Sequence, residues 1–313
     1  MQQQRGFVVG LIGLLWTTWA AAAPVHHSLE VTLQPGTAGI EVRDSVSLPQ
    51  GHPPSLTFSL HPALTPTLPD GNARLVELAR QTDSNQQAAV GITPRRYRLD
   101  LAPGENSFTL HYTGSIAHAL QNRGEEYARS FQETRGIISA QGVFLSGASL
   151  WYPQLDDTQL TFDLVVHLPE AWKGMSQGKL LDTGPAADSG PVEHWQASNP
   201  QEEIYLIAGP FTAYSSVDSD VTARVLLREP DAALAHKYLD ATHEYIALYD
   251  SLIGPYPFDK FALVENFWET GYGMPSFTLL GSRVIRFPFI LTSSYPHEIL
   301  HNWWGNSVYV DYD

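Results

Sequence analysis

The chain has 313 residues, enough for about two domains, and 43% of them are hydrophobic, so a sizeable core is possible. Its net charge is −15, so the chain lacks the excess of basic residues that is typical of nucleic-acid-binding proteins. The same charge disfavours docking to anionic lipid. The charge favours solubility, with attraction of cationic peptides as the alternative. No cysteine is present, which excludes disulfides and cysteine-ligated zinc, so any zinc must be held by histidine and carboxylate side chains.

The first residues have the order of a secretory signal peptide. Arg5 precedes an uncharged run over residues 6–23, and small alanines close that run. Cleavage after Ala22 satisfies the preference for small residues before the cut, so residues 1–22 are predicted to be removed. The alternative is an uncleaved membrane anchor, because the run is near the lower length limit for a span. We expect an exported protein, periplasmic or secreted, with no stable membrane span after cleavage.

Strand signals dominate from residue 29 to about residue 227, and they predict a β domain over residues 23–220. Residues 107–112 and 159–168 alternate polar and apolar side chains, which is typical of half-buried strands. Glycine and proline punctuate the intervals, and the polar, small residues 182–190 are predicted to form a loop. Shorter strands are predicted at residues 29–33, 56–60, 97–101, 204–208 and 221–227.

The periodicity becomes helical after Pro230, and residues 221–313 are predicted to begin an α-rich domain. Gly254-Pro255 ends the first helix, and strands are predicted at residues 261–264 and 277–285. Ser293 and Ser294 are candidate caps of a second helix that ends near Gly305. We therefore expect a multidomain α+β chain. The apolar positions of the first helix, spaced by three and four, are Leu234, Tyr238, Ala241, Tyr245, Leu248 and Leu252.

The pentad His297-Glu298-Ile299-Leu300-His301, on the second predicted helix, is the strongest functional signal. Residues four apart share one helical face, so the two imidazoles can bind one metal ion. The carboxylate of Glu298 can then take a proton from a water molecule that the metal activates. The alternative is a surface helix with solvated histidines, but Trp303 and its apolar neighbours favour burial, where His and Glu need partners. His297 and His301 are thus predicted metal ligands, and Glu298 the general base.

Two histidines do not complete a catalytic zinc site, which normally has three protein ligands. The metzincin extension HExxHxxGxxH is excluded, because Trp304 stands where glycine is needed and Ser307 where histidine is needed. Asp311 and Asp313 are available carboxylates, although their interpretation as two exposed acids is preferred. The third ligand is therefore expected from beyond residue 313.

Other histidines give weaker signals. His26 and His27 lie beside the predicted mature N-terminus, where a flexible tail is the preferred interpretation and metal scavenging the alternative. His243 lies on the first predicted helix without a second histidine at matching spacing, so it is interpreted as structural.

Residues 297–306, HEILHNWWGN, resemble the zinc helix of the membrane alanyl aminopeptidase family of gluzincin zinc metallopeptidases. Residues 253–258 resemble the entry to that family's catalytic domain, and residues 142–145 and 151–153 resemble its β domain. The resemblance covers most of the mature chain. It implies an N-terminal β-sheet saddle or sandwich followed by the first part of a thermolysin-like α/β catalytic domain, with the chain a C-terminally truncated member.

The resemblance implies peptide-bond hydrolysis, with zinc held by His297 and His301 and with Glu298 activating zinc-bound water. The family's third ligand is a glutamate on a later helix, which this chain does not reach; its oxyanion-stabilising tyrosine is further on. The family's GxMEN motif supplies a glutamate for the substrate's free amine, whereas Pro275 stands at that position here. Gly273 and Met274 are expected to bind substrate. Glu265 and Glu269 could bind the amine, with ordinary surface acids as the preferred alternative.

Two functions follow from these residues. The first is a zinc-dependent, aminopeptidase-like metallopeptidase that acts on peptide substrates and is inactive as this chain alone if the third ligand is required. The second is a non-catalytic exported module that binds a peptide or a partner and retains a degenerate zinc site. Zinc stoichiometry near one and loss of hydrolysis in Glu298→Gln would favour the first.

Overall fold

The computed structural model describes residues 23–69, 71, 73–79, 92–122, 132–156, 158–185, 190–218 and 220–307. The predicted signal peptide, residues 1–22, lies outside this part of the chain, as do Asp311 and Asp313. Among the described residues, no helix combines the length and the hydrophobicity that crossing a membrane requires.

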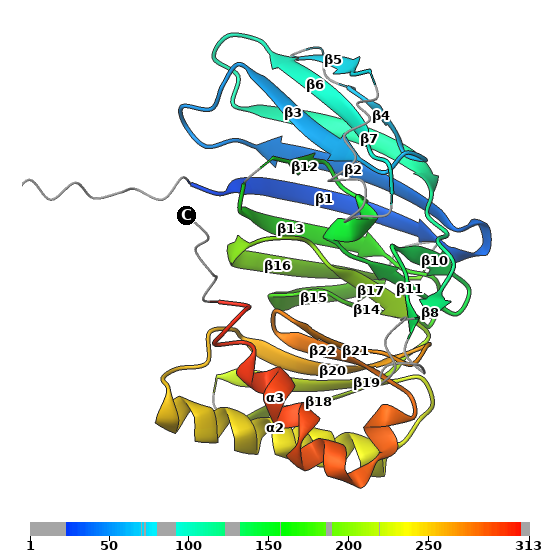
Figure 1. Cartoon of the computed structure of the whole chain (residues 1–313), viewed down its shortest axis with the longest axis vertical. Helices are drawn as coiled ribbons and strands as arrows, with labels where there is room; N and C mark the ends of the chain where they lie inside the picture. The colour runs from blue at the N-terminus through cyan, green and yellow to red at the C-terminus, as the bar shows by residue number, and fades with distance from the viewer. Residues whose placement is uncertain are drawn as a thin grey trace, which may run out of the picture.

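A seven-stranded sheet forms the centre of the β-rich part (Figure 1). Its middle strand β1 (Val25–Gln34) pairs in parallel with β13 (Leu160–His167) and antiparallel with β2 (Gly39–Ser47). Every second side chain of β13 is buried, as the alternation of its sequence predicts. The sheet has the order β15-β16-β13-β1-β2-β7-β4, in which the other strands are β15 (Lys179–Pro185), β16 (Pro191–Gln201), β7 (Ser107–Ser115) and β4 (Thr65–Thr67).

Smaller sheets flank this one, and a single cluster of buried side chains that includes Trp151 and Trp195 joins them. The first has the order β10 (Ile137–Ser139), β11 (Gly142–Leu145), β17 (Leu206–Gly209) and β14 (Lys173–Met175). The second has the order β12 (Gln154–Leu155), β3 (Ser55–Leu60), β6 (Arg95–Leu101) and β5 (Ala73–Glu77). A two-stranded sheet pairs β8 (Gln121–Asn122) with β9 (Gln132–Glu133).

A five-stranded sheet lies between the β-rich part and the helices (Figure 1). Its three inner strands are parallel, and its two edge strands are antiparallel to their neighbours. On β20, Ala262 and Val264 join the core shared with the β-rich part, whereas Phe261 and Leu263 join a second core with the helices. Covered on both faces, β20 is buried along its whole length. The order is β18 (Thr212–Asp218), β19 (Val221–Leu227), β20 (Lys260–Asn266), β22 (Phe277–Gly281) and β21 (Gly271–Met274).

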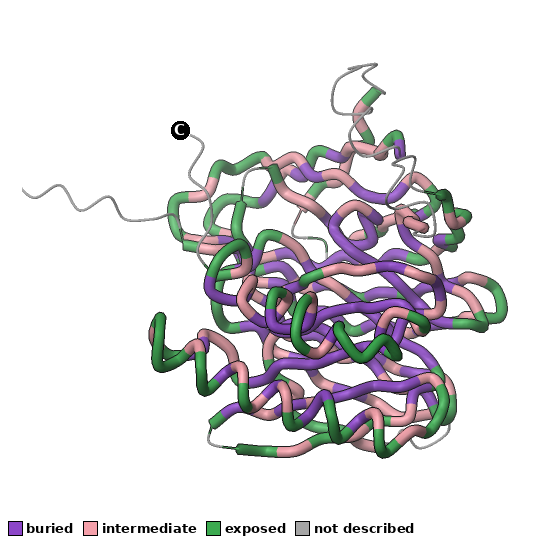
Figure 2. The backbone as a smooth tube through the Cα atoms, turned by 60° about the horizontal axis from the view of Figure 1, so that its bottom comes forward, coloured by how far each residue is buried: buried purple, intermediate pink, exposed green. Residues whose placement is uncertain are grey.

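Two α-helices pack on the outer face of this sheet, and their outward sides are exposed (Figure 2). The side chain of Asp231 accepts a hydrogen bond from the N–H of Leu234 at 2.9 Å and so caps the first helix. The chain leaves that helix through Gly254, whose φ of 139° favours glycine. The helices are α2 (Ala232–Leu252) and α3 (Ser294–Leu300), and the 3₁₀ turns are η1 (Pro35–Thr37), η3 (Gly147–Ser149), η4 (Val284–Arg286) and η5 (Pro288–Thr292).

The α+β class expected from the sequence is confirmed, and its strand predictions are largely met. The domain boundary near residue 220 stays a prediction; β18, which ends at Asp218, pairs with β19. The predicted loop over residues 182–190 is wrong in its first part, since β15 continues to Pro185 by pairing with β16. The predicted strand over residues 277–285 ends earlier, because η4 begins at Val284.

The interpretation of His26 and His27 as a flexible tail is wrong. Both residues lie in β1, which is held on each side by a strand of the largest sheet. His27 is only 1% exposed, and its Nδ1 lies 2.8 Å from Oδ2 of Asp44. A buried carboxylate needs such a partner, so this histidine is part of the core.

Candidate metal centre

The end of α3 brings the two imidazoles of the HExxH pentad together. His297 and His301 lie one helical turn apart, and their Nε2 atoms approach to 3.0 Å. The ring planes are nearly perpendicular, at 80°, with centroids 4.4 Å apart. His297 is exposed and His301 half-buried, so the pair is open to a ligand from solvent.

The backbone after α3 sets the tautomer of His301. Its Nδ1 lies 3.3 Å from the carbonyl oxygen of Trp304, which can only accept a hydrogen bond. With the proton on Nδ1, Nε2 of His301 has a lone pair that accepts a hydrogen bond from Nε2 of His297 at 3.0 Å. A metal-binding histidine typically donates its second ring N–H to a carbonyl in this way.

A second histidine pair has the opposite arrangement. Nε2 of His61 lies 2.8 Å from Nε2 of His118, but the N–H of Ala63 donates to Nδ1 of His61 at 3.1 Å. The proton of His61 is then on Nε2, where it donates to His118. A neutral His61 with this tautomer thus has no lone pair at Nε2, whereas His301 keeps one there.

Glu298 lies on the inner side of the same turn, against the backbone of β21. A Cβ atom added to Gly273 would lie only 2.5 Å from Oε2 of Glu298, so this approach requires glycine. Burial raises the pKa of Glu298, and the neighbouring His301 and His297 partly offset that rise. The carboxylate is thus held close to the histidine pair with an increased affinity for a proton.

A buried chain of hydrogen bonds fixes β21 against α3. Oδ1 of Asn302 accepts from the N–H of Ser276 at 2.7 Å, and its Nδ2 donates to the carbonyl oxygens of Glu298 and Ile299 at 3.2 and 3.0 Å. Ser276 forms the turn between β21 and β22 with a left-handed φ of 68°. Its Oγ accepts from Nζ of Lys260 at 2.8 Å. Sequence reasoning missed all three residues, because their contacts join segments far apart in the chain.

Lys260 has no carboxylate partner among the described residues. Its Nζ donates to Oγ and to the carbonyl oxygen of Ser276 and lies 5.4 Å from the ring centroids of Trp195 and Phe277. Burial lowers the pKa of Lys260 well below its usual value, and the charge of Arg224 adds to the effect. Its two hydrogen bonds and its contact with Trp195 therefore join the β-rich part to the turn at Ser276.

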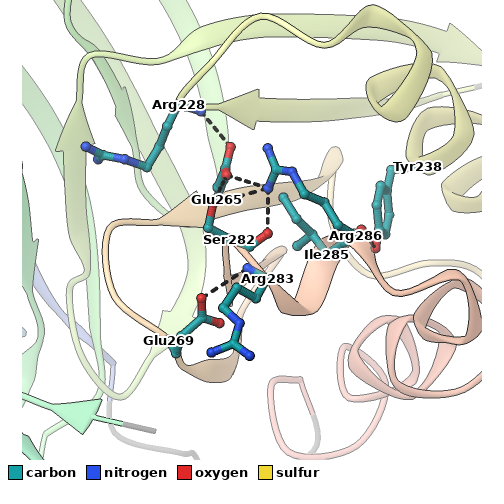
Figure 3. Close-up of polar contacts among 8 residues, drawn as sticks. All are labelled: Arg228, Tyr238, Glu265, Glu269, Ser282, Arg283, Ile285 and Arg286. Carbon is teal, nitrogen blue, oxygen red and sulfur yellow. Dashed lines mark hydrogen bonds and ion pairs between the residues drawn. The ribbon is translucent and has the colours of Figure 1, made fainter. Parts of the chain in front are cut away.

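The two predicted amine-binding acids have structural partners (Figure 3). Glu265 is 1% exposed and accepts from the N–H of Arg228 at 2.8 Å, from Nη1 of Arg286 at 2.7 Å and from the hydroxyl of Ser282. It is therefore not the surface acid that the sequence favoured, and its ion pair with Arg286 leaves little capacity for a substrate amine. Glu269 accepts from the N–H of Arg283 at 3.1 Å.

The remaining predicted substrate residues lie on β21. Gly273 is exposed beside Glu298, whereas Met274 is buried at 2% exposure in the main core. Both border a cavity of about 240 Å³. Within the described part of the chain, no three or more His, Cys, Asp or Glu side chains are placed to hold one metal ion. His297 and His301 could supply two ligands.

Neither a family model nor a curated protein matches the sequence of this chain. Solved structures do match. The M1 zinc metallopeptidase of Deinococcus radiodurans has a TM-score of 0.63 at 14% identity and covers 90% of this chain. A mutant of that enzyme bound to a Tyr-Ser-Ala substrate has a TM-score of 0.60 at 14% identity, with the same coverage. A two-domain M1 zinc metallopeptidase mutant bound to L-arginine has a TM-score of 0.63 at 15% identity.

The chain has the fold of M1 zinc metallopeptidases. The likeness covers 90% of this chain, and the expected β-sheet domain followed by the start of a catalytic domain agrees with it. This chain spans 65% of the length of the Deinococcus enzyme and of its tripeptide complex, and 66% of the arginine-bound protein. At such low identity the likeness establishes the fold alone. The activity has to be argued from the residues of this chain.

Proposed function

We propose that this chain carries the β domain and the metal-binding helix of a zinc-dependent metallopeptidase of the M1, aminopeptidase-like kind. One observation carries the proposal: in this fold, the Nε2 atoms of His297 and His301 lie 3.0 Å apart while Glu298 lies against β21. The proton on Nδ1 of His301 leaves its Nε2 lone pair free for a divalent ion, and the HExxH spacing is that of zinc peptidases.

In this proposal His297 and His301 hold the zinc ion, and a third ligand comes from residues beyond 313. When bound, zinc supplies a Lewis acid and lowers the pKa of water to about 7. Glu298 accepts a proton and later returns it to the leaving amine. Its raised pKa suits both steps, because a base works best when its pKa approaches the working pH.

The edge strand β21 orients the substrate. It pairs only with β22 among the described strands, so its other side offers backbone N–H and carbonyl groups to an extended peptide. Gly273 keeps this edge next to Glu298, which brings a bound peptide bond toward the general base. Short peptides are the proposed substrates, as in the M1 neighbour bound to a tripeptide.

Three further assignments belong to the proposal. Residues 1–22 are a cleaved signal peptide, so the mature protein is exported to the periplasm or the medium. Residues 23–220 form the β domain, and residues 221–313 begin the peptidase domain.

Zinc binding and hydrolysis test the proposal separately. Purified chain should bind zinc, and His297→Ala and His301→Ala should each weaken binding at least about tenfold, as loss of one ligand predicts. His236→Ala, at an exposed position on α2, is the matched control and should change nothing. Equal zinc affinity in all four proteins would contradict the assignment.

Hydrolysis is measured on the chain and on a version extended until zinc is fully bound. Glu298→Gln should retain zinc and lose hydrolysis of tripeptides at least about a hundredfold, because the general base is gone. Unchanged hydrolysis in Glu298→Gln would refute the role of Glu298. N-acetylated tripeptides distinguish an exopeptidase from an endopeptidase, since a blocked amine defeats only the former.

A further inference from the structure

A cavity of about 510 Å³ lies at the end of the largest sheet where the parallel strands β1 and β13 begin. His27 of β1 and Leu160 of β13 line it, together with the segment from η3 to β12 and with Glu202 and Glu203. None of the described residues that line this cavity belongs to β21 or α3. Its volume lies in the range of sites that bind small molecules, so it is a second candidate site, separate from the HExxH turn.

His27 brings a polar atom to the inner wall of this cavity. The residue is almost completely buried, and its Nδ1 lies 2.8 Å from Oδ2 of the buried Asp44. No described residue forms a hydrogen bond with the other ring nitrogen, Nε2, and Nε2 is not one of the fully enclosed polar atoms that lack a partner. Because His27 lines the cavity, the space onto which Nε2 opens is the cavity itself.

The surroundings of His27 hold its ring in one orientation. An ionised carboxylate can only accept a hydrogen bond, so the side chain of Asp44 keeps a proton on Nδ1 of His27. Tyr152 packs edge-on against the imidazole, with ring centroids 5.7 Å apart and an angle of 81°. Nε2 has a lone pair in the neutral ring and an N–H in the protonated ring. In either state it needs a hydrogen-bond partner, which a ligand in the cavity would supply.

Amide and hydroxyl groups form the outer part of the lining, at Gln154, Thr158 and Gln159. Nε2 of Gln154 donates to the carbonyl oxygen of Gly147 at 2.5 Å, which fixes that amide at the wall. Thr158 and Gln159 are exposed at the rim. Side-chain amides and hydroxyls both donate and accept hydrogen bonds, so this lining suits a ligand whose groups do the same.

The charges at the cavity disfavour an anion. The described lining has no lysine or arginine, whereas it has the carboxylates of Glu202 and Glu203. The two oxygens of Glu203 already accept from the hydroxyl of Tyr205 and from the N–H of Gly147. The imidazole of His27 would repel a cation whenever it is protonated. A neutral ligand with several hydroxyl groups is therefore the best match.

We propose that this cavity binds a neutral monosaccharide and that Nε2 of His27 forms a hydrogen bond with one of its hydroxyl groups. A hydroxyl both donates and accepts, so it satisfies Nε2 in either protonation state of the ring. Neighbouring hydroxyls on the sugar ring suit the amides of Gln154 and Gln159 in the same way. The inference goes beyond the proposed peptidase function and does not depend on it.

Titration of the whole chain with small sugars, followed by NMR, tests the proposal. Glucose, galactose, mannose and N-acetylglucosamine are the probes. At least one of them should bind with a Kd of about 1 mM or below. Tetrahydropyran has the same six-membered ring without hydroxyl groups, and it should bind at least about tenfold more weakly because it offers no hydrogen-bond donor.

Charged forms of the sugar that binds best test the choice of a neutral ligand. The probes are the uronate and the amino sugar of the same stereochemistry, such as glucuronate and glucosamine for glucose. Neither should bind more tightly than the neutral sugar. An amino sugar that binds tenfold more tightly would show that the cavity selects a cation, and a uronate that does so would show that it selects an anion. Either result would overturn the proposal.

Substitutions place the sugar at His27. His27→Gln keeps an amide donor for Asp44 but removes Nε2 from the cavity, so it should weaken sugar binding at least about tenfold. The matched control is His52→Gln, at a histidine outside the cavity that contacts the carbonyl oxygen of Pro53, and it should have no effect. If His27→Gln does not fold, Gln159→Ala at the rim provides the test and should weaken binding at least about threefold, whereas the exposed Gln141→Ala should not.

The proposal is overturned if no sugar binds better than tetrahydropyran. It is also overturned if the substitution in the cavity and its matched control bind the sugar equally well. The same titrations in His297→Ala should give unchanged affinity, and loss of sugar binding there would place the sugar at the HExxH turn instead. Because these measurements need neither zinc nor hydrolysis, the sugar site is tested independently of the peptidase proposal.

Discussion

Asn302 is the side chain whose removal should most weaken the contact between β21 and the HExxH turn. In Asn302→Ala, the N–H of Ser276 loses a buried acceptor at 2.7 Å, and the carbonyl oxygens of Glu298 and Ile299 lose a donor. An unsatisfied buried N–H costs about 1–3 kcal/mol, and the lost bonds to the two carbonyls add roughly 1 kcal/mol. We expect the free energy of unfolding to fall by about 2–4 kcal/mol.

Urea unfolding followed by tryptophan fluorescence measures this change. The matched control is Asn199→Ala, because Asn199 is exposed and makes one long hydrogen bond, of 3.4 Å, to the carbonyl oxygen of Pro257. That variant should lose less than about 0.5 kcal/mol. Equal destabilisation by the two substitutions would refute the structural role assigned to Asn302.

Three further predictions concern single residues. Gly273→Ala should displace the carboxylate of Glu298 and so lower hydrolysis by the zinc-loaded enzyme at least about tenfold, at a cost of less than about 1 kcal/mol of stability. The control Gly184→Ala, where the added methyl group meets open space, should change neither hydrolysis nor stability. Burial lowers the pKa of Lys260 below its unfolded value of about 10.4, so the unfolded chain binds more protons than the fold between these two pKa values. Stability should therefore rise with pH up to about 10.4, by at most about 1.4 kcal/mol per pH unit. Lys260→Met should remove this slope, and Lys237→Met, on the exposed side of α2, should keep it. Burial, with the neighbouring His118, lowers the pKa of His61 to about 4, below its unfolded value of about 6.5. The unfolded chain therefore binds more protons between these pH values, and the free energy of unfolding should fall by about 2 kcal/mol as the pH drops from 6.5 to 4. A fall of equal size in His61→Gln would contradict the assignment.

Local patterns predicted the elements that depend on nearby residues. The alternation along residues 159–168 indicated β13, and the helical spacing of apolar residues after Pro230, with the stop at Gly254, indicated the first long helix. The spacing of His297 and His301 indicated that their imidazoles lie side by side, because residues four apart share one face of a helix.

Local patterns did not predict contacts between segments that are far apart in the sequence. His27 was taken for part of a tail, since nothing near it in the sequence indicates that Asp44 lies across the adjacent strand. Glu265 was taken for a surface acid, although Arg286 and the backbone of Arg228 enclose it in the fold. In both cases the hydrogen-bonding partner comes close only because of the way in which the strands and turns are arranged in the fold.

The support beneath the HExxH turn was missed for the same reason. Lys260, Ser276 and Asn302 belong to a strand, a turn and a helix end, and their hydrogen bonds form only when all three meet.

The central claim is that His297 and His301 hold a metal ion, and zinc-edge anomalous diffraction from zinc-soaked crystals tests it most directly. The account predicts a peak within about 2.1 Å of both Nε2 atoms of His297 and His301. It predicts no peak between His61 and His118, because the N–H of Ala63 fixes the proton of His61 on Nε2. An empty HExxH turn in crystals that bind zinc elsewhere, or a peak at the His61–His118 pair, would contradict the account.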